Sequence, residues 1–82
     1  MRRYQSHKIV EAAKILGIQR MTPDGNYAVA IDDGEGLDVP PKVFARGEPE
    51  VGDYMVRYSD GYLSWSPAQA FEDGYILLED AA

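Results

Sequence analysis

Residues 53–66, DYMVRYSDGYLSWS, limit the possible folds more than any other stretch of the chain. Apolar and polar residues alternate on both sides of Asp60 and Gly61, and alternation with a period of two is typical of a β-strand. Asp-Gly is a favoured pair for a two-residue type I′ turn, so the segment predicts a β-hairpin that turns at these residues. In this hairpin Val56 lies opposite Trp65, and both turn residues have a positive φ.

The predicted hairpin has one apolar face and one polar face, because neighbouring strand residues point to opposite sides of a sheet. The apolar face, assigned to the core, holds Tyr54, Val56, Tyr58, Leu63 and Trp65. The polar face holds Met55, Arg57, Ser59, Tyr62, Ser64 and Ser66. An arginine beside a tyrosine ring and hydroxyl groups suits a phosphate joined to a base or a sugar. The polar face is therefore a candidate ligand surface, and an ordinary solvated sheet face is the alternative.

Residues 6–20 are compatible with a strand or a helix, and their surroundings favour the strand. If residues 6–20 form a strand, apolar residues lie on both of its faces. In a helix, Ser6 would cap the first turn and Gly17 would end the last. Turn-forming residues 22–26 and the apolar run 27–31 come next, so a strand, a turn and a second strand make one continuous unit.

Two short segments before the hairpin are assigned to a loop and a helical turn. Residues 32–36, DDGEG, form an acidic hairpin tip, because they lack the ligand spacing of a calcium-binding loop. Residues 40–47, PPKVFARG, form one helical turn, because proline suits the first turn and glycine suits the position after the last. Val43 and Phe44 attach this turn to the core.

A helix is predicted directly after the hairpin. Ser66 is followed by a proline, which is a capping signature, so we expect a helix over 67–73 with Ser66 as its N-cap. Ala70 and Phe71 face the sheet, and Gly74 ends the helix.

Length and composition limit the chain to one small domain. It has 82 residues and no cysteine, which excludes disulfides and thiolate metal sites. We expect residues 1–82 to form a single compact α+β domain, with a small, mostly antiparallel sheet that can curl towards a barrel and one or two short helices. Residues 75–78 add a last short strand, and residues 79–82 form a frayed tail. The small core favours a homo-oligomer.

Charge is distributed unevenly along the chain. Residues 1–20 carry five basic residues and one acidic residue, whereas residues 21–82 carry three basic and thirteen acidic residues. Most of the chain would repel phosphates, so nucleic acid is not an expected partner. The acidic part either keeps a small protein soluble or meets a basic protein partner. Neither a signal-peptide core nor an apolar run of about 20 residues is present, so we expect a cytoplasmic protein without membrane contact.

The sequence offers few groups for catalysis. His7 is the single histidine, and no nucleophile-elbow or phosphate-cradling glycine motif occurs. One histidine without cysteine gives no zinc site. We therefore predict that the protein is not an enzyme and has no catalytic residues, no metal and no cofactor.

Two segments resemble a family of small proteins from tailed-bacteriophage genomes. These segments are YQSHK, residues 4–8, and VGDYMVRYSDGYLSWSPAQAFEDGY, residues 51–75. The family shares a YQSHK-like start and an end similar to PevGdYxVxYeDGYxSxSPaeaFExGY. The matching residues of the second segment and its flank are Pro49, Gly52, Asp53, Tyr54, Val56, Tyr58, Asp60, Gly61, Tyr62, Ser64, Ser66, Pro67, Ala68, Ala70, Phe71, Glu72, Gly74 and Tyr75. The match covers both ends of the chain, and the middle is not distinctive.

The resemblance implies a phage accessory protein in the host cytoplasm, and by analogy one that counters host defence. We predict that it sequesters a small anionic, nucleotide-type immune signal as a homo-oligomer, with the site between protomers. Arg57 would pair with phosphate, and Tyr62 and Tyr4 would stack on a base. The further predicted ligand-binding residues are Ser64, Ser66, Gln5, His7 and Lys8. The alternatives are an acidic inhibitor that docks on a host defence protein and a structural phage protein.

Overall fold

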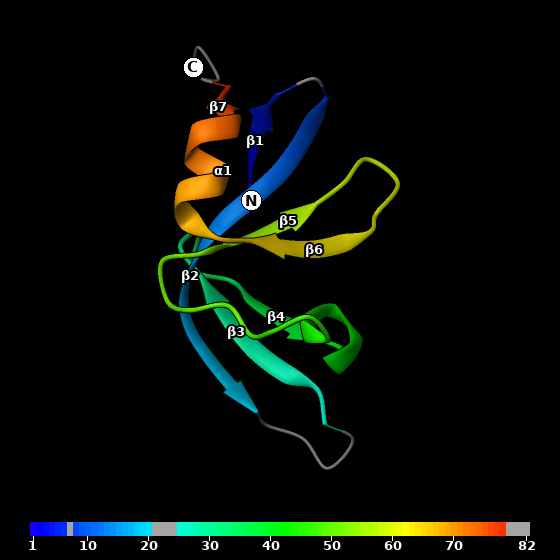
Figure 1. The fold of residues 1–82 in the computed structure, drawn as a ribbon. Helices are drawn as coiled ribbons and strands as arrows, with labels where there is room; N and C mark the ends of the chain where they lie inside the picture. The colour runs from blue at the N-terminus through cyan, green and yellow to red at the C-terminus, as the bar shows by residue number, and fades with distance from the viewer. Residues whose placement is uncertain (7, 21–24, 79–82) are drawn as a thin grey trace.

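Seven strands, one α-helix and one 3-10 helix make up the part of the chain that the computed structural model describes, namely residues 1–6, 8–20 and 25–78 (Figure 1). The elements in chain order are β1 (Arg2–Gln5), β2 (Ile9–Arg20), β3 (Tyr27–Ile31), β4 (Gly36–Val39), η1 (Pro41–Phe44), β5 (Tyr54–Arg57), β6 (Leu63–Ser66), α1 (Ala68–Gly74) and β7 (Ile76–Leu77). The strands form one open antiparallel sheet in the order β4-β3-β2-β1-β7, with β5 beside β2 and β6 beside β5. The predicted α+β class is confirmed. The expectations for His7, for most of the turn 22–26 and for the tail 79–82 lie outside the described residues.

β2 is the strand around which the fold is built, and the prediction of a strand here is confirmed. Its first half pairs with β1 and β5, and its second half pairs with β3. Between Ile15 and Gly17 the register with β3 shifts by one residue, and such a bulge bends a strand. The neighbours Ala12 and Ala13 are 0% and 2% exposed. A strand can bury consecutive residues on opposite faces, which explains why the strand is adopted rather than an amphipathic helix.

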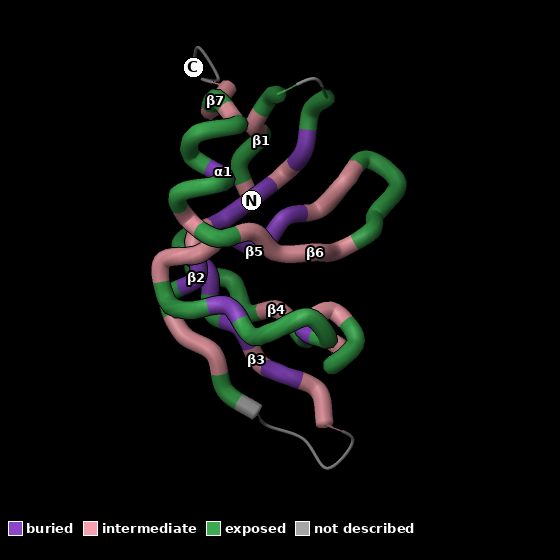
Figure 2. Tube along the Cα trace, in the orientation of Figure 1, coloured by how far each residue is buried: buried purple, intermediate pink, exposed green. Residues whose placement is uncertain are grey.

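Two clusters of buried side chains lie on opposite faces of β2 and β5, because neighbouring residues of these strands belong to different clusters. Figure 2 shows the buried residues of both strands in purple. The first, here called the strand core, consists of Ala13, Ile15, Tyr27, Val29, Ile31, Val39, Phe44 and Met55. The second, here called the helix core, consists of Val10, Ala12, Tyr54, Val56 and Phe71. Phe71 comes from α1, so the helix covers one face of the sheet as predicted. Ala70 is exposed, so its predicted contact with the sheet is wrong.

The hairpin of β5 and β6 forms where it was predicted, but the predicted register is wrong by one residue. Met55 lies opposite Trp65, and Val56 lies opposite Ser64. Because side chains alternate, a slip of one residue moves every β6 side chain to the other face relative to β5.

The hairpin loop has three residues instead of the predicted two. The N–H of Gly61 donates to the carbonyl of Tyr58, and the N–H of Tyr58 donates to the carbonyl of Tyr62, both at 2.9 Å. Gly61 has a φ of 88°, whereas Asp60 is not among the residues with positive φ. This geometry fits a three-residue loop in which a turn is followed by one left-handed glycine.

The corrected register changes the two faces of the hairpin. Tyr54, Val56, Tyr58, Tyr62, Ser64 and Ser66 now share the face that α1 covers, and Met55, Arg57, Leu63 and Trp65 share the other. Arg57 therefore does not share a face with Tyr62 and the serines. The predicted grouping on one polar face is wrong.

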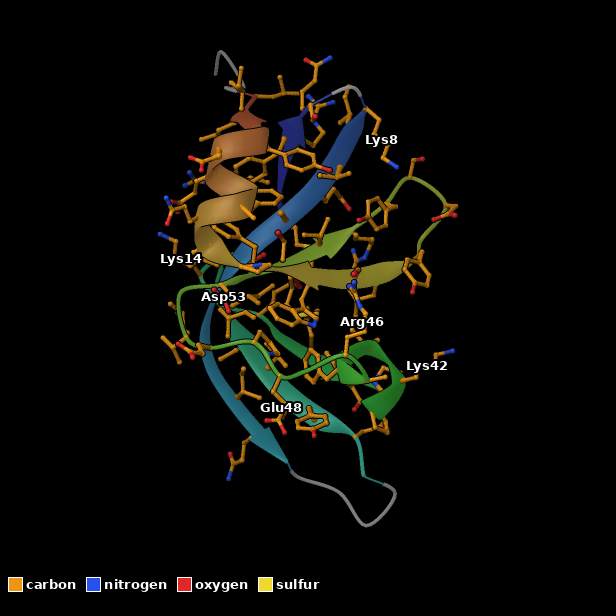
Figure 3. All side chains as sticks on the ribbon, in the orientation of Figure 1. Lys8, Lys14, Lys42, Arg46, Glu48 and Asp53 are labelled. Carbon is orange, nitrogen blue, oxygen red and sulfur yellow. The ribbon has the colours of Figure 1, made fainter. Side chains whose placement is uncertain are left out.

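The start of α1 is capped by a residue that the sequence pattern did not indicate. Ser66 belongs to β6, and its Oγ reaches only the carbonyl of Pro67, at 3.4 Å. The first helical N–H, that of Ala68, instead donates to Oδ1 of Asp53 at 2.8 Å. Oδ2 of Asp53 accepts the N–H of Glu50, also at 2.8 Å. The predicted Ser66 cap is wrong, and Asp53 joins the start of β5 to the start of the helix (Figure 3).

The remaining element predictions are confirmed. The N–H of Ile31 donates to the carbonyl of Glu35, which closes the acidic tip between β3 and β4. η1 forms within residues 40–47, with Phe44 buried. β7 pairs with β1 as the last strand. The sequence reasoning did not anticipate β1, a short, mostly exposed strand between β2 and β7, or β4, a short strand at the edge of the sheet.

Candidate anion-binding site

A hollow of about 360 Å³ opens where β2 and the β5–β6 hairpin separate. β2 begins at Ile9, but its pairing with β5 begins at Glu11. Beyond this point the hairpin turns away from β2, as Figure 1 shows. The hollow is lined by Arg3, Ile9, Val10, Glu11, Arg57, Tyr58, Ser59 and Gly61.

A row of three charged side chains crosses the base of the hollow. Arg3 lies opposite Glu11 in the β1–β2 ladder, and Glu11 lies opposite Arg57 in the β2–β5 ladder. Nη1 of Arg57 is 3.6 Å from Oε1 of Glu11, and the two side chains are 43% and 46% exposed. An ion pair this exposed contributes little to stability, about 0–1 kcal/mol. Arg57 can therefore exchange this partner for a ligand at small cost.

A lysine and two tyrosine rings stand beside the hollow. Nζ of Lys8 is 4.8 Å from the centroid of the Tyr58 ring, within the range of a cation–π contact. The Tyr58 ring is stacked on that of Tyr62, with centroids 6.0 Å apart. Tyr62 is 64% exposed, so much of its surface remains open. Figure 3 shows Lys8 at the start of β2, pointing towards the β5–β6 loop.

The charge around the hollow is opposite to that of the whole chain. Among the described residues that line the hollow, Arg3 and Arg57 are basic and Glu11 is acidic, and Lys8 lies over the ring of the lining residue Tyr58, so these groups together carry a net positive charge. The chain as a whole has a formal net charge of −6. A locally positive hollow in a negative molecule attracts anions to one place.

Three of the predicted ligand-binding residues gather around the hairpin loop. These are Arg57, Tyr62 and Lys8, which come from β5, the β5–β6 loop and the turn that precedes β2. The sequence reasoning missed Arg3, Glu11 and Tyr58. Their positions follow from strand register, which no local pattern in the sequence states.

The other predicted ligand-binding residues lie elsewhere. Ser64 and Ser66 are partly buried on the face that α1 covers, and Gln5 is exposed in β1. The Tyr4 ring makes T-shaped contacts with Phe71 and Tyr54, with centroids 4.8 and 6.1 Å apart, so it packs on the helix core and does not line the hollow. Burial raises the pKa of the Tyr4 hydroxyl. His7 lies outside the described residues.

A second hollow, of about 440 Å³, lies on the other side of the hairpin loop. It is lined by Pro40, Lys42, Val43, Gly61, Tyr62 and Leu63. Tyr62 thus contributes to this hollow, whereas Tyr58 contributes to the first. The first hollow has more charged groups and is the better anion site.

A separate polar network joins β2, β5 and α1. The hydroxyl of Tyr54 donates to Oε2 of Glu72 at 2.9 Å, and Nζ of Lys14 is 3.9 Å from the same oxygen. Burial, followed by the hydrogen bond to Glu72, raises the pKa of Tyr54 well above its usual value. All three groups have partners within the protein, so the network stabilises the fold and offers no site.

Comparison with known proteins adds no relative to this picture. No protein-family model, no curated protein and no solved structure matches the chain. Within the described residues, no group of three or more histidine, cysteine or acidic side chains could hold a metal ion. The helices in this part of the chain are too short to cross a bilayer.

Proposed function

We propose that the protein is a non-enzymatic phage accessory protein that binds a small anionic ligand of nucleotide type in the hollow beside the β5–β6 loop. One observation carries this proposal. Arg57 and Tyr58 line the same hollow, Lys8 lies over the Tyr58 ring, and Tyr58 is stacked with Tyr62. Cations with an open aromatic ring match a phosphate attached to a base.

The proposed contacts follow from the geometry of the free site. Arg57 turns its planar fork from Glu11 to the phosphate, because the charged fork binds phosphate through two parallel hydrogen bonds. Lys8 adds a second positive charge at the rim. The base stacks on the Tyr58 ring, which lines the hollow. Tyr62 is stacked against Tyr58 and largely exposed, so it extends this aromatic surface.

The proposed role is to sequester a nucleotide-type immune signal in the host cytoplasm, with the protein acting as a homo-oligomer. This role is supported by the resemblance to phage accessory proteins and by the lack of a catalytic motif in the sequence. The contacts proposed above are those of one protomer. The position of the site between protomers stays a prediction.

Calorimetric titration with pyrophosphate and with linear and cyclic nucleotides tests the proposal. Arg57→Ala should weaken binding by about 10- to 100-fold, since a charged hydrogen bond contributes roughly 1.5–3 kcal/mol. Glu11→Gln should instead strengthen binding, because it frees Arg57 and removes a carboxylate from the hollow. Arg46→Ala is the matched control, since Arg46 is exposed and does not line the hollow. Equal affinities in all three variants, or no binding of any tested anion at millimolar concentration, would exclude the site.

The second candidate function is an acidic inhibitor of a host defence protein. The N–H of Asp32, in the tip between β3 and β4, donates to the carbonyl of Lys14 at 3.0 Å, and Nζ of Lys14 is 3.9 Å from Oε2 of Glu72 in α1. Acidic residues from distant parts of the sequence therefore lie beside the same residue of β2. A pull-down from host lysate should then retain a basic protein at low salt, and Asp32→Asn with Glu72→Gln should release it. Arg57→Ala should leave such capture intact.

A further inference from the structure

The second half of β2 has one free edge. Up to Ile15 this edge is covered, because the N–H of Ile15 donates to the carbonyl of Asp53 at 2.8 Å and its carbonyl accepts the N–H of Gly52 at 2.9 Å. From Leu16 to Arg20, β2 pairs only with β3 among the described residues. Figure 1 shows β3 along one edge of this half of β2 and no strand along the other.

Hydrogen-bond alternation shows which backbone groups of β2 point to the free edge. The N–H of Ile31 donates to Glu35, so Ile31 and, by alternation, Val29 direct their backbone groups towards β4. Ala28 and Ala30 then direct theirs towards β2, where they lie opposite Gln19 and Gly17. The N–H and C=O groups of the intervening β2 residues, Ile18 and Arg20, consequently point away from β3.

We infer that this free edge of β2 pairs with the same edge of a second copy of the chain. In an antiparallel pair whose two-fold axis passes at Gln19, Ile18 lies opposite the second copy's Arg20, and Arg20 lies opposite the second copy's Ile18. All four outward backbone groups of each copy then have partners. The edge is complementary to itself, as a two-fold dimer requires.

The other edges of the sheet are less suited to a second copy. β4 carries Asp38 and is followed by Pro40 and Pro41. Charged residues and prolines hinder the pairing of an edge strand with another chain. β6 contacts η1, and β7, at the end of the sheet, has only two residues. The free edge of β2 has neither an acid nor a proline.

The inferred interface is separate from the proposed anion site. Val10 lines the hollow, and Ile18 is eight residues further along β2. At about 3.3 Å per residue the two positions are roughly 26 Å apart. The dimer would therefore carry its two hollows at its outer ends, and loss of the dimer would leave ligand binding unchanged.

Charge at Gln19 tests the interface. Gln19 is exposed, so Gln19→Lys should not disturb the folded monomer. In the inferred dimer it places two like charges directly opposite each other, which should raise the dissociation constant about tenfold or more. Gln69→Lys, at an exposed position of α1, changes the net charge by the same amount and should leave the dimer intact. An equimolar mixture of Gln19→Lys and Gln19→Glu should restore the dimer, because opposite charges then face each other.

Sedimentation equilibrium over micromolar to millimolar concentrations provides the mass, and hydrogen exchange provides the location. The wild type should reach twice 9.1 kDa, with the amides of Ile18 and Arg20 becoming protected as the concentration rises. A wild type that stays at 9.1 kDa would overturn the inference. So would a dimer that Gln19→Lys leaves intact, or one that Gln69→Lys disrupts equally. Nucleotide titration of Gln19→Lys keeps a failure of this interface distinct from a failure of the anion site.

Discussion

At the scale of single residues, the carboxylate of Asp53 joins two elements through its two oxygens. Oδ1 accepts the first N–H of α1, and Oδ2 accepts the N–H of Glu50, each at 2.8 Å. Asp53→Ala would leave both donors without this partner, so we expect the free energy of unfolding in urea to fall by about 1–2 kcal/mol. Ser66→Ala should change it by less than about 0.5 kcal/mol, since Ser66 caps nothing. Equal losses in the two variants would contradict this assignment.

The cap also shows what local sequence patterns miss. Ser66 stands directly before Pro67 and fits the capping signature, whereas Asp53 precedes Ala68 by fifteen residues. The cap reaches the helix only because β5 and β6 pair and bring both ends of the hairpin together. A contact made by tertiary structure leaves no periodic or local signal.

The hydroxyl of Tyr54 makes stability depend on pH in the alkaline range. Burial and the hydrogen bond to Glu72 raise its pKa in the folded state, whereas an unfolded tyrosine titrates near 10. Above about pH 10 the folded state therefore binds more protons than the unfolded state, and the free energy of unfolding falls as pH rises. Urea unfolding at about pH 9 to 11 should show this decrease, and Tyr54→Phe should reduce its slope. An unchanged slope in Tyr54→Phe would assign the decrease to other groups.

At the scale of elements, the sequence located the hairpin but not its register. The pair Asp60-Gly61 fits two kinds of hairpin loop. In a two-residue loop both residues have a positive φ, whereas in a three-residue loop only the glycine has one. The structure contains the three-residue loop. The one-residue difference moved Arg57 away from the face of Tyr62. Some residues of the candidate site were thus named from the sequence, but which side chains lie on the same face was not predicted.

β2 was predicted more securely because its pattern extends over twelve residues and both of its faces are apolar in part. β1 has four mostly exposed side chains and no alternating apolar pattern, and β4 alternates apolar with other residues over only four positions. Their pairing partners, and with them the position of Arg3 beside Glu11, depend on tertiary contacts. The length of a strand and the difference between its apolar and polar residues determined whether it could be predicted from the sequence.

Gly61, in the hairpin loop, and Gly74, at the end of α1, allow a matched test of the loop conformation. Gly61 has a φ of 88°, a conformation that side chains with a Cβ rarely adopt. Gly61→Ala should therefore lower the free energy of unfolding by about 1–2 kcal/mol. Gly74 belongs to α1 and has open space around an added Cβ, so Gly74→Ala should be neutral or stabilising by up to about 1 kcal/mol. Thermal unfolding of both variants measures these changes in stability. An unchanged stability of Gly61→Ala would contradict the assignment of a three-residue loop with a left-handed Gly61.

At the scale of the whole molecule, β2 and β5 connect two cores that would each be very small alone. Ala12 belongs to the helix core and its neighbour Ala13 to the strand core. Met55 and Val56 divide in the same way. Loss of packing on one face displaces strands that the other face also needs. We therefore expect the two cores to unfold together in one transition.

Phe71 and Trp65 permit a direct test of this coupling, because they lie on opposite sides of the sheet. Phe71 is 1% exposed in the helix core and stacks on Tyr54 with centroids 4.4 Å apart, so Phe71→Leu should cost about 1–2 kcal/mol. Trp65 packs against the strand core and is the single tryptophan, so its fluorescence reports that core. If the cores unfold together, Phe71→Leu lowers the urea midpoint seen by Trp65 fluorescence as much as the midpoint seen by hydrogen exchange in α1. A Trp65 transition that stays at the wild-type midpoint while α1 loses protection would show that the two cores are independent.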